Sequence, residues 1–264
     1  MADFSAKDVQ ALRRTTGAGM MDAKKALVQN DGDAEAAAHW LRETGIAKSA
    51  SRSDRDNSEG IVVARVEGDV AAILELKCET DFVAKSDQFG ELAESLLASV
   101  LAQGEDAVSQ DSSELENLRI TLKENIDLGQ VVRYESSEGS VLDAYVHQQN
   151  GRGVNAVLVE IHDGTQEVAH DVALHIASSR PKYLTREDVP VDVVAAERET
   201  LENITRNEGK PDQAIEKIVD GRMSGFFRDT ALLEQKFVKD EKLGVTDLLG
   251  TATVSRFAQV EIGN

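Results

Sequence analysis

The chain has 264 residues and a formal net charge of −19, because 48 Asp and Glu outnumber 29 Lys and Arg. Apolar residues make up 41% of the sequence, so this length predicts one or two domains with a real buried core. The negative charge repels phosphate backbones and only 4% of the residues are aromatic, which together argue against a primary role in nucleic-acid binding.

Residues 1–46 predict a module of three short helices. A unit of this size is near the lower limit for independent folding, which argues against an enzyme domain. The next stretch, residues 47–59, is polar, lacks large apolar side chains and predicts a linker. Within the module we expect helices from about Ser5 to a left-handed stop at Gly17, from about Met21 to the turn at Asn30, and from Asp33 to a stop at Thr44-Gly45.

A first core subdomain is predicted over residues 60–138, where the apolar period changes to two. Alternation from Ile61 to Val66, a turn around Gly68 and an apolar run up to Cys78 predict a β-hairpin. Apolar residues spaced by three or four then predict helices over about Ser86–Ala102 and Glu114–Asn125, followed by a strand over Val131–Tyr134.

A second core subdomain, residues 139–264, repeats this arrangement. The segments Ala71–Leu76 and Asn155–Ile161 occupy the same place in the two units, which favours two related hairpin-plus-helix subdomains. The alternative is that buried hairpins resemble one another in general. In the second unit we expect strands over Ser140–His147 and Val154–Ile161, a helix over about Glu167–Ser178, a short helix near Thr246 and a last strand over Val254–Ile262.

An insertion at about residues 187–228 is predicted to interrupt the second subdomain. Two apolar helical repeats are separated by Gly209-Lys210-Pro211, and helices joined by so short a turn run antiparallel. The segment therefore predicts a helical hairpin or short coiled coil, and the fold class of the whole chain is α+β.

No pattern for catalysis or for a bound cofactor or metal stands out. The sequence lacks both Gly-rich phosphate motifs, and none of its five His has the HExxH spacing. The single cysteine, Cys78, excludes an intramolecular disulfide and ends an apolar strand, where inert cysteines lie. A rival interpretation, an enzyme that uses Cys78, His147 and a carboxylate, predicts that these groups share one pocket. The N-terminus has no signal-peptide pattern and no apolar run approaches the roughly 20 residues of a membrane helix, so we expect a cytoplasmic protein without a membrane partner.

The segment from Glu79 to Ser86, which joins the second strand to its helix, allows two interpretations. In the first, Phe82 packs on Phe89 as a hydrophobic staple ahead of the N-cap Ser86. In the second, Phe82 points outward on a short connection and anchors a partner's groove. The residues by themselves favour the staple.

Two strings in the sequence, TGAGMMDAKKAL (Thr16–Leu27) and TDFVAKS (Thr80–Ser86), resemble the two signatures of the translation elongation factor Ts family. This family comprises nucleotide-exchange factors for elongation factor Tu. The similarity runs in order along essentially the whole chain, and it shifts the balance toward an outward Phe82. Further matching strings are HIASSRPKYL (His175–Leu184), GKP (Gly209–Pro211), EKIVDGRM (Glu216–Met223) and FVKD (Phe237–Asp240).

The resemblance implies a three-helix module like ubiquitin-associated domains, two related core subdomains and a coiled-coil insertion. It also implies that the protein binds the GDP form of elongation factor Tu, and that Thr80, Asp81, Phe82 and Val83 disturb the Mg²⁺ and phosphate environment so that GDP leaves. Longer family members carry a C-terminal helix that we expect this chain, which stops at Asn264, to lack. Partner contacts carried over from the family are Arg13, Met20, Met21, Ile126 and His147.

The alternative function is a ubiquitin-associated-like adaptor or scaffold without exchange activity. It predicts that the protein has no effect on nucleotide release and that Phe82 is dispensable. A homodimer through the core or the coiled coil is left open by the sequence, and no cofactor or direct nucleic-acid partner is expected.

Overall fold

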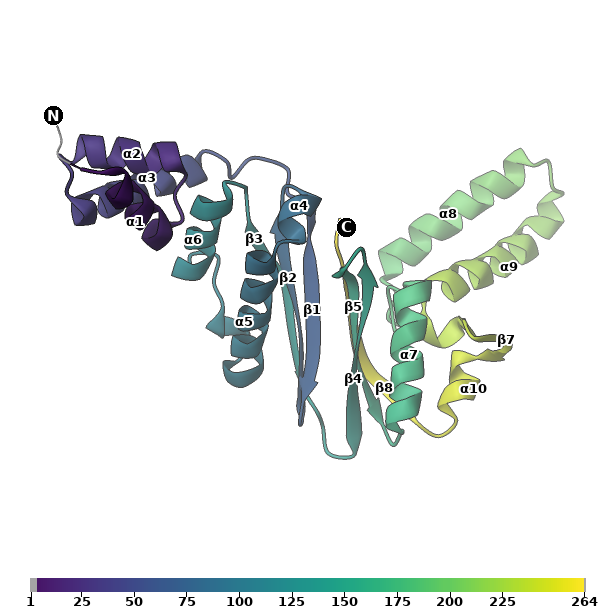
Figure 1. Cartoon of the computed structure of the whole chain (residues 1–264). Coiled ribbons are helices and arrows are strands. Elements are labelled where there is room, and N and C mark those ends of the chain that lie inside the picture. The colour runs from purple at the N-terminus through teal and green to yellow at the C-terminus, as the bar shows by residue number, and fades with distance from the viewer. Residues whose placement is uncertain (1–3, 264) are drawn as a thin grey trace.

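The computed structural model describes residues 4–263, apart from the side chains of residues 47, 48 and 50. The outermost residues of the predicted first module and second subdomain lie outside this range. Along the molecule, an N-terminal helical module is followed by a core of two sheets and then by a projecting pair of long helices (Figure 1). The fold is mixed helix and sheet, as the class α+β predicts.

The N-terminal module consists of three helices around a small apolar core. Ser5 begins the first helix, where its backbone amide and hydroxyl donate to Asp8 Oδ2 at 2.7 and 2.8 Å. Gly17 ends it with φ 68°, the left-handed geometry that glycine adopts most easily. The helices are α1 (Ala6–Thr16), α2 (Met20–Gln29) and α3 (Ala34–Ala50), and their buried apolar residues are Val9, Leu12, Ala23, Ala26, Leu27 and Ala37.

The prediction that Gly45 stops the third helix is wrong, because α3 continues to Ala50. A β-carbon at Gly45 would lie 2.8 Å from Ile120 Cγ2, so the glycine lets α3 approach helix α6 (Ser113–Leu122) closely. The predicted linker is correspondingly shorter, since only residues 51–58 lie between α3 and the first strand.

The first sheet and its helices make up one half of the core. Its three antiparallel strands have the order β1-β2-β3, and the turn between the first two is tight, with Glu67 paired to Val70. A long helix, α5, packs on one face of the sheet, and β2 is buried on both faces. The elements of this half, besides α6, are β1 (Glu59–Glu67), β2 (Val70–Cys78), α4 (Asp81–Ala84), α5 (Asp87–Gln103), the 3-10 helix η1 (Glu105–Ala107) and β3 (Asp127–Glu135).

The second sheet has the same topology and lies face to face with the first. Its strand order is β4-β5-β8, all antiparallel, and α7 covers its outer face. In Figure 1 the layers run α5, first sheet, second sheet, α7. Apolar residues such as Ile73 and Leu158 fill the space between the sheets. The elements are β4 (Ser140–Gln149), β5 (Arg152–His162), α7 (Gln166–Ser179) and β8 (Thr253–Glu261).

The two central strands, β2 and β5, correspond residue by residue. Ala71 and Ile73 face the space between the sheets, as Ala156 and Leu158 do, and the alternate residues of both strands face the helices. Each strand carries one buried glutamate, Glu75 or Glu160, beside an irregularity in the register with the third strand. General similarity between buried hairpins requires neither the same three-stranded topology nor a buried acid at the same position. Both features favour two related subdomains.

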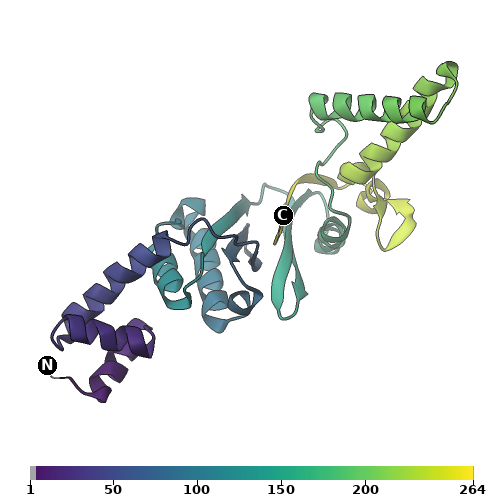
Figure 2. The same cartoon turned by 90° about the horizontal axis from the view of Figure 1, so that it is seen from above.

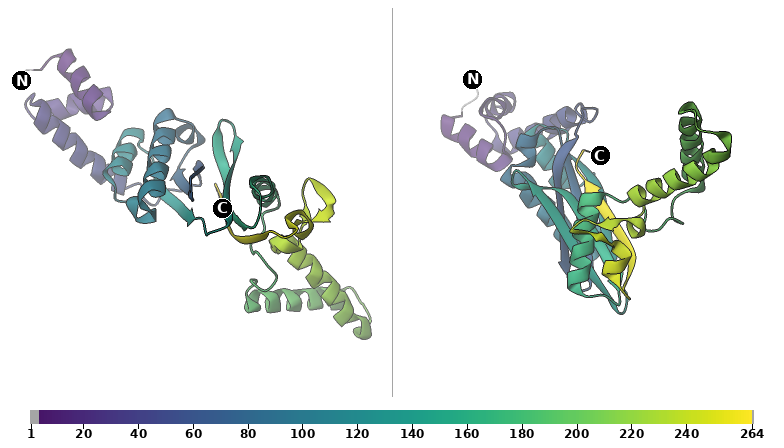
Figure 3. Two further views of the ribbon diagram at one scale, coloured as in Figure 1. Left: turned by 90° about the horizontal axis from the view of Figure 1, so that it is seen from below. Right: turned by 90° about the vertical axis from the view of Figure 1, so that its right-hand side faces the viewer.

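The insertion consists of two long helices that project from the core, most clearly seen in Figure 2 and in both views of Figure 3. They begin and end slightly later than the predicted range 187–228, and an apolar cluster along them includes Ile215, Met223 and Phe227. A small hairpin of two short strands after them was not predicted. The elements are α8 (Val191–Asn207), α9 (Asp212–Thr230), the 3-10 helix η2 (Leu232–Glu234), β6 (Lys236–Phe237), β7 (Asp240–Gly244) and α10 (Val245–Leu249).

Candidate partner-binding surface

The segment Thr80–Val83 lies at the start of a single helical turn, α4, rather than in an irregular loop. Thr80 is its N-cap, with extended backbone (φ −127°), and its hydroxyl accepts a hydrogen bond from the Val83 amide at 3.3 Å. A helix of only four residues is too short to show an apolar repeat in the sequence. The sequence therefore predicts only a connection here.

The Phe82 side chain points away from its own subdomain. It is 83% exposed, whereas Phe89 is fully buried, so the staple between these two rings is wrong and the outward orientation is confirmed. Ala84, at the end of the same turn, is buried, and Val83 packs against the core below. Because Val83 and Ala84 hold one side of α4 against the core, the ring of Phe82 lies on the side of α4 that faces solvent.

Asp81 places a negative charge beside this exposed ring. Its carboxylate pairs with Lys85 Nζ at 2.5 Å, one helical turn later. The hydrogen bond from Lys85 lowers the pKa of Asp81, and the charge of Arg152 acts in the same direction. An ionised carboxylate and an apolar ring therefore share one small protrusion at neutral pH.

His147 lies at the same end of the core as α4. It is exposed near the end of β4, opposite Asn155 of β5, and the β4–β5 hairpin reaches up beside α4 in Figure 1. The hairpin is fixed there by Arg152, whose guanidinium donates to the Gly60 carbonyl at 2.5 Å and pairs with Glu59 of β1. The structure thus brings His147 and Phe82 to one edge of the molecule.

Arg13, Met20 and Met21 lie on the helical module, apart from α4. Arg13 is exposed on α1, and the two methionines open α2 with exposed fractions of 50% and 74%. Helix α6 stands between the module and α4 in Figure 1. Two flexible thioether side chains at one helix end form a small adaptable apolar surface.

Ile126 is fully buried, so the expectation that its side chain contacts a partner is corrected by the structure. It belongs to the core beneath β2 and α5, and its carbonyl accepts a 2.6 Å hydrogen bond from Arg119 Nε. The contact was carried over from the family resemblance, which does not indicate whether this side chain faces the core or the solvent.

The rival enzyme interpretation finds no site among these residues. Cys78 is buried, its thiol donates to the Thr80 carbonyl at 3.2 Å, and burial raises its pKa to about 12. His147 is exposed on the other sheet, whereas the Cys78 side chain is fully buried, so the thiol does not open onto the surface where His147 lies. Over residues 4–263, His, Cys, Asp and Glu side chains nowhere gather in a group of three or more that could hold a metal ion. None of the helices in this range combines the length and the apolar composition that a membrane span requires.

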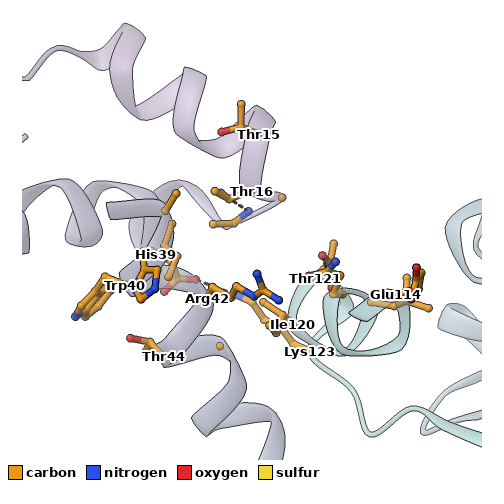
Figure 4. Close-up of a pocket in the computed structure, with 18 of the residues that line it drawn as sticks. Thr15, Thr16, His39, Trp40, Arg42, Thr44, Glu114, Ile120, Thr121 and Lys123 are labelled. Carbon is orange, nitrogen blue, oxygen red and sulfur yellow. Dashed lines mark hydrogen bonds and ion pairs between the residues drawn. The ribbon is translucent and has the colours of Figure 1, made fainter. Parts of the chain in front are cut away.

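A cleft of about 950 Å³ separates the helical module from the first half of the core. In Figure 4, Trp40 and Thr44 of α3 lie on one side and Ile120 and Thr121 of α6 on the other. A salt bridge between Lys123 and Asp22, at 3.0 Å, connects the two sides. No local sequence signal predicts this cleft, because its walls come from segments far apart in the chain.

Comparison with known proteins identifies the family. The family model described as "Elongation factor TS" matches residues 79–264. Over the full length of both chains, the sequence is 43% identical to the Elongation factor Ts of Clavibacter michiganensis subsp. michiganensis and 40% identical to that of Pseudarthrobacter chlorophenolicus. It is 42% identical to the Elongation factor Ts of Acidothermus cellulolyticus, covering all of this chain and 99% of that one. This chain therefore belongs to the elongation factor Ts family and is a translation elongation factor.

Proposed function

We propose that the protein is a guanine-nucleotide exchange factor, not an enzyme, that binds the GDP form of elongation factor Tu. In this proposal the Thr80–Val83 turn disturbs the Mg²⁺ and phosphate site of the partner and so promotes release of GDP. The observation that carries it is Phe82, a large apolar ring left 83% exposed on an anchored turn. An exposed aromatic of this kind is the usual anchor of a protein interface.

The roles of the site residues follow from their chemistry. Phe82 enters an apolar space in the partner, and the ionised Asp81 next to it places negative charge near bound Mg²⁺ and phosphate. Met20 and Met21 give the module an adaptable apolar contact, and Arg13 adds a cation close by in the sequence. His147 extends the contact along the core, while Ile126 supports the base of the site from inside.

Two features of the architecture are part of the same proposal. We assign α1, α2 and α3 to a module like ubiquitin-associated domains, which holds the partner while α4 acts on it. We assign α8 and α9 to a short coiled coil, since an apolar cluster lies along the two helices. A homodimer through the core or this coiled coil stays a prediction.

The test is stopped-flow release of fluorescent GDP from elongation factor Tu, with and without the protein. The wild-type chain should accelerate release, and Phe82→Ala should slow the accelerated rate by about one to two decades without abolishing binding. Leu243→Ala, which trims another exposed apolar side chain, is the control and should leave the rate unchanged.

The adaptor alternative makes the opposite prediction for this assay. An adaptor would bind without changing the release rate, and Phe82→Ala would have no effect. Full acceleration by Phe82→Ala would refute the role of the ring, and no acceleration by the wild type would refute exchange activity altogether.

A further inference from the structure

We infer that Glu124 is a positioning residue that fixes the α4 turn and, through it, the direction of Phe82; the inference rests on the proposed exchange function. Glu124 lies between α6 and β3, and its carboxylate accepts three hydrogen bonds from the segment that enters α4. Oε2 accepts from the amides of Glu79 and Thr80 at 3.0 and 3.1 Å, and Oε1 accepts from the Thr80 hydroxyl at 2.5 Å.

The α4 turn needs such an external support because it is only four residues long. Isolated helices shorter than about 12 residues are marginal in water, and the exposed Phe82 ring adds no packing of its own. Val83 and Ala84 anchor the C-terminal half of the turn in the core. The N-terminal half depends on Glu124, since the Thr80 hydroxyl that bonds to it also accepts from the Val83 amide.

A reciprocal contact holds the same two segments together from the other side. Glu79 Oε1 accepts from the Asn125 amide at 2.7 Å. The Asn125 side chain donates to the carbonyls of Ser53 and Arg55, at 3.2 and 2.8 Å, in the connection that leads from the helical module. The loop that carries Glu124 therefore ties α4 both to the core and to the segment entering from the module.

These contacts give Glu124 a positioning role that its place in the loop between α6 and β3 does not by itself suggest. Charge-assisted bonds to three donors restrict the backbone from Glu79 to Thr80 before any partner is present. A pre-ordered anchor loses less entropy on binding, and a displaced one inserts less effectively. Loss of the Glu124 carboxylate should therefore lower the rate of GDP release in the complex more than it lowers the affinity of the protein for its partner.

The test compares Glu124→Gln with Glu138→Gln, a control with the same charge change at an exposed site in the β3–β4 turn. For Glu124→Gln we expect the maximal rate of GDP release at saturating factor to fall about tenfold, which is the loss of about 1.4 kcal/mol, while half-saturation shifts less. In the free protein, amide hydrogen exchange across residues 79–84 should become about tenfold faster. The control should match the wild type in both measurements.

Thr80→Val removes the same contact from the other partner and should slow release similarly, and far-UV circular dichroism verifies that each variant is folded. Unchanged release by both folded variants, or unchanged amide exchange, overturns the positioning role. Phe82→Ala is measured alongside: if it slows release while Glu124→Gln does not, only this inference fails. If Phe82→Ala also releases GDP at the wild-type rate, the proposed function fails and the inference falls with it.

Discussion

Replacing Glu160 by Gln tests how the second sheet is stabilised. Its side chain is almost completely buried on β5, yet it carries a charge satisfied from three directions. The Ser137 amide and the Ser140 hydroxyl donate to Oε1 at 2.7 and 2.6 Å, and Arg256 Nε donates to Oε2 at 2.7 Å. The Arg256 guanidinium also lies over the Tyr134 ring of the first sheet, so this pair joins the two sheets.

The expected loss of folding free energy follows from the pKa of Glu160. Burial by itself would raise this pKa, but the bonds from Ser140, Ser137 and Arg256 outweigh it and lower the value from 4.5 to about 2. At 1.36 kcal/mol per pKa unit, this lowering corresponds to about 3 kcal/mol of folding free energy at neutral pH. Glu160→Gln should lose most of it, because the amide oxygen of Gln keeps neutral hydrogen bonds but not the charge.

Urea unfolding followed by far-UV circular dichroism measures the loss. At pH 7, Glu160→Gln should be about 2–3 kcal/mol less stable than the wild type, and Glu138→Gln, an exposed change nearby, should lie within about 0.5 kcal/mol. Because the folded pKa is lowered, the stabilisation is present above pH 4.5 and is lost as pH falls toward 2. The difference between the two proteins should shrink over that range, where other carboxylates titrate equally in both. A difference below about 1 kcal/mol at pH 7, or one that does not change with pH, would refute this account.

Two further predictions concern other parts of the fold. Cys78, whose pKa burial raises to about 12, should react with a thiol reagent at pH 8 only when the protein is unfolded in urea; rapid reaction of the native protein would show that this strand end opens. Gly90→Ala, where a methyl group meets nothing within 4 Å, should stabilise α5 by up to about 1 kcal/mol, whereas Gly45→Ala should gain nothing because of Ile120. Equal stabilisation of the two in thermal unfolding would show that α3 is not held closely against α6.

The sheets and longer helices could be predicted from the sequence because local patterns determine them. The alternation before Gly68 and the apolar run after it predicted the first hairpin, and the observed pairing of Glu67 with Val70 confirms it. The role of Gly45 could not be predicted, because it depends on Ile120, which lies 75 residues away in the chain. The short strands β6 and β7 give no periodicity from which to predict them.

The site was harder to predict than the fold, for the same physical reason. Which of Phe82, Val83 and Ala84 faces inward depends on the α4 turn, and that turn depends on hydrogen bonds to Glu124, 44 residues beyond Thr80. The residues by themselves favoured the staple, and only the family resemblance indicated the outward ring. Ile126 shows the limit of that resemblance, which implies a partner contact at a residue whose side chain the core encloses.

The size of the proposed effect limits how much of the binding free energy each group of site residues can supply. A 10⁴-fold weakening of nucleotide binding needs about 5.5 kcal/mol of differential binding, and burial of one Phe supplies about 1.5–3. By reciprocity, the nucleotide weakens the hold of the factor equally, so contacts made in both states raise affinity without promoting release. The remainder must come from contacts made only when Phe82 is inserted, which makes the pre-ordering of α4 by Glu124 consequential. Variants on α4 should therefore lower the maximal rate, whereas variants at Met20 or Met21 should raise the concentration of factor required.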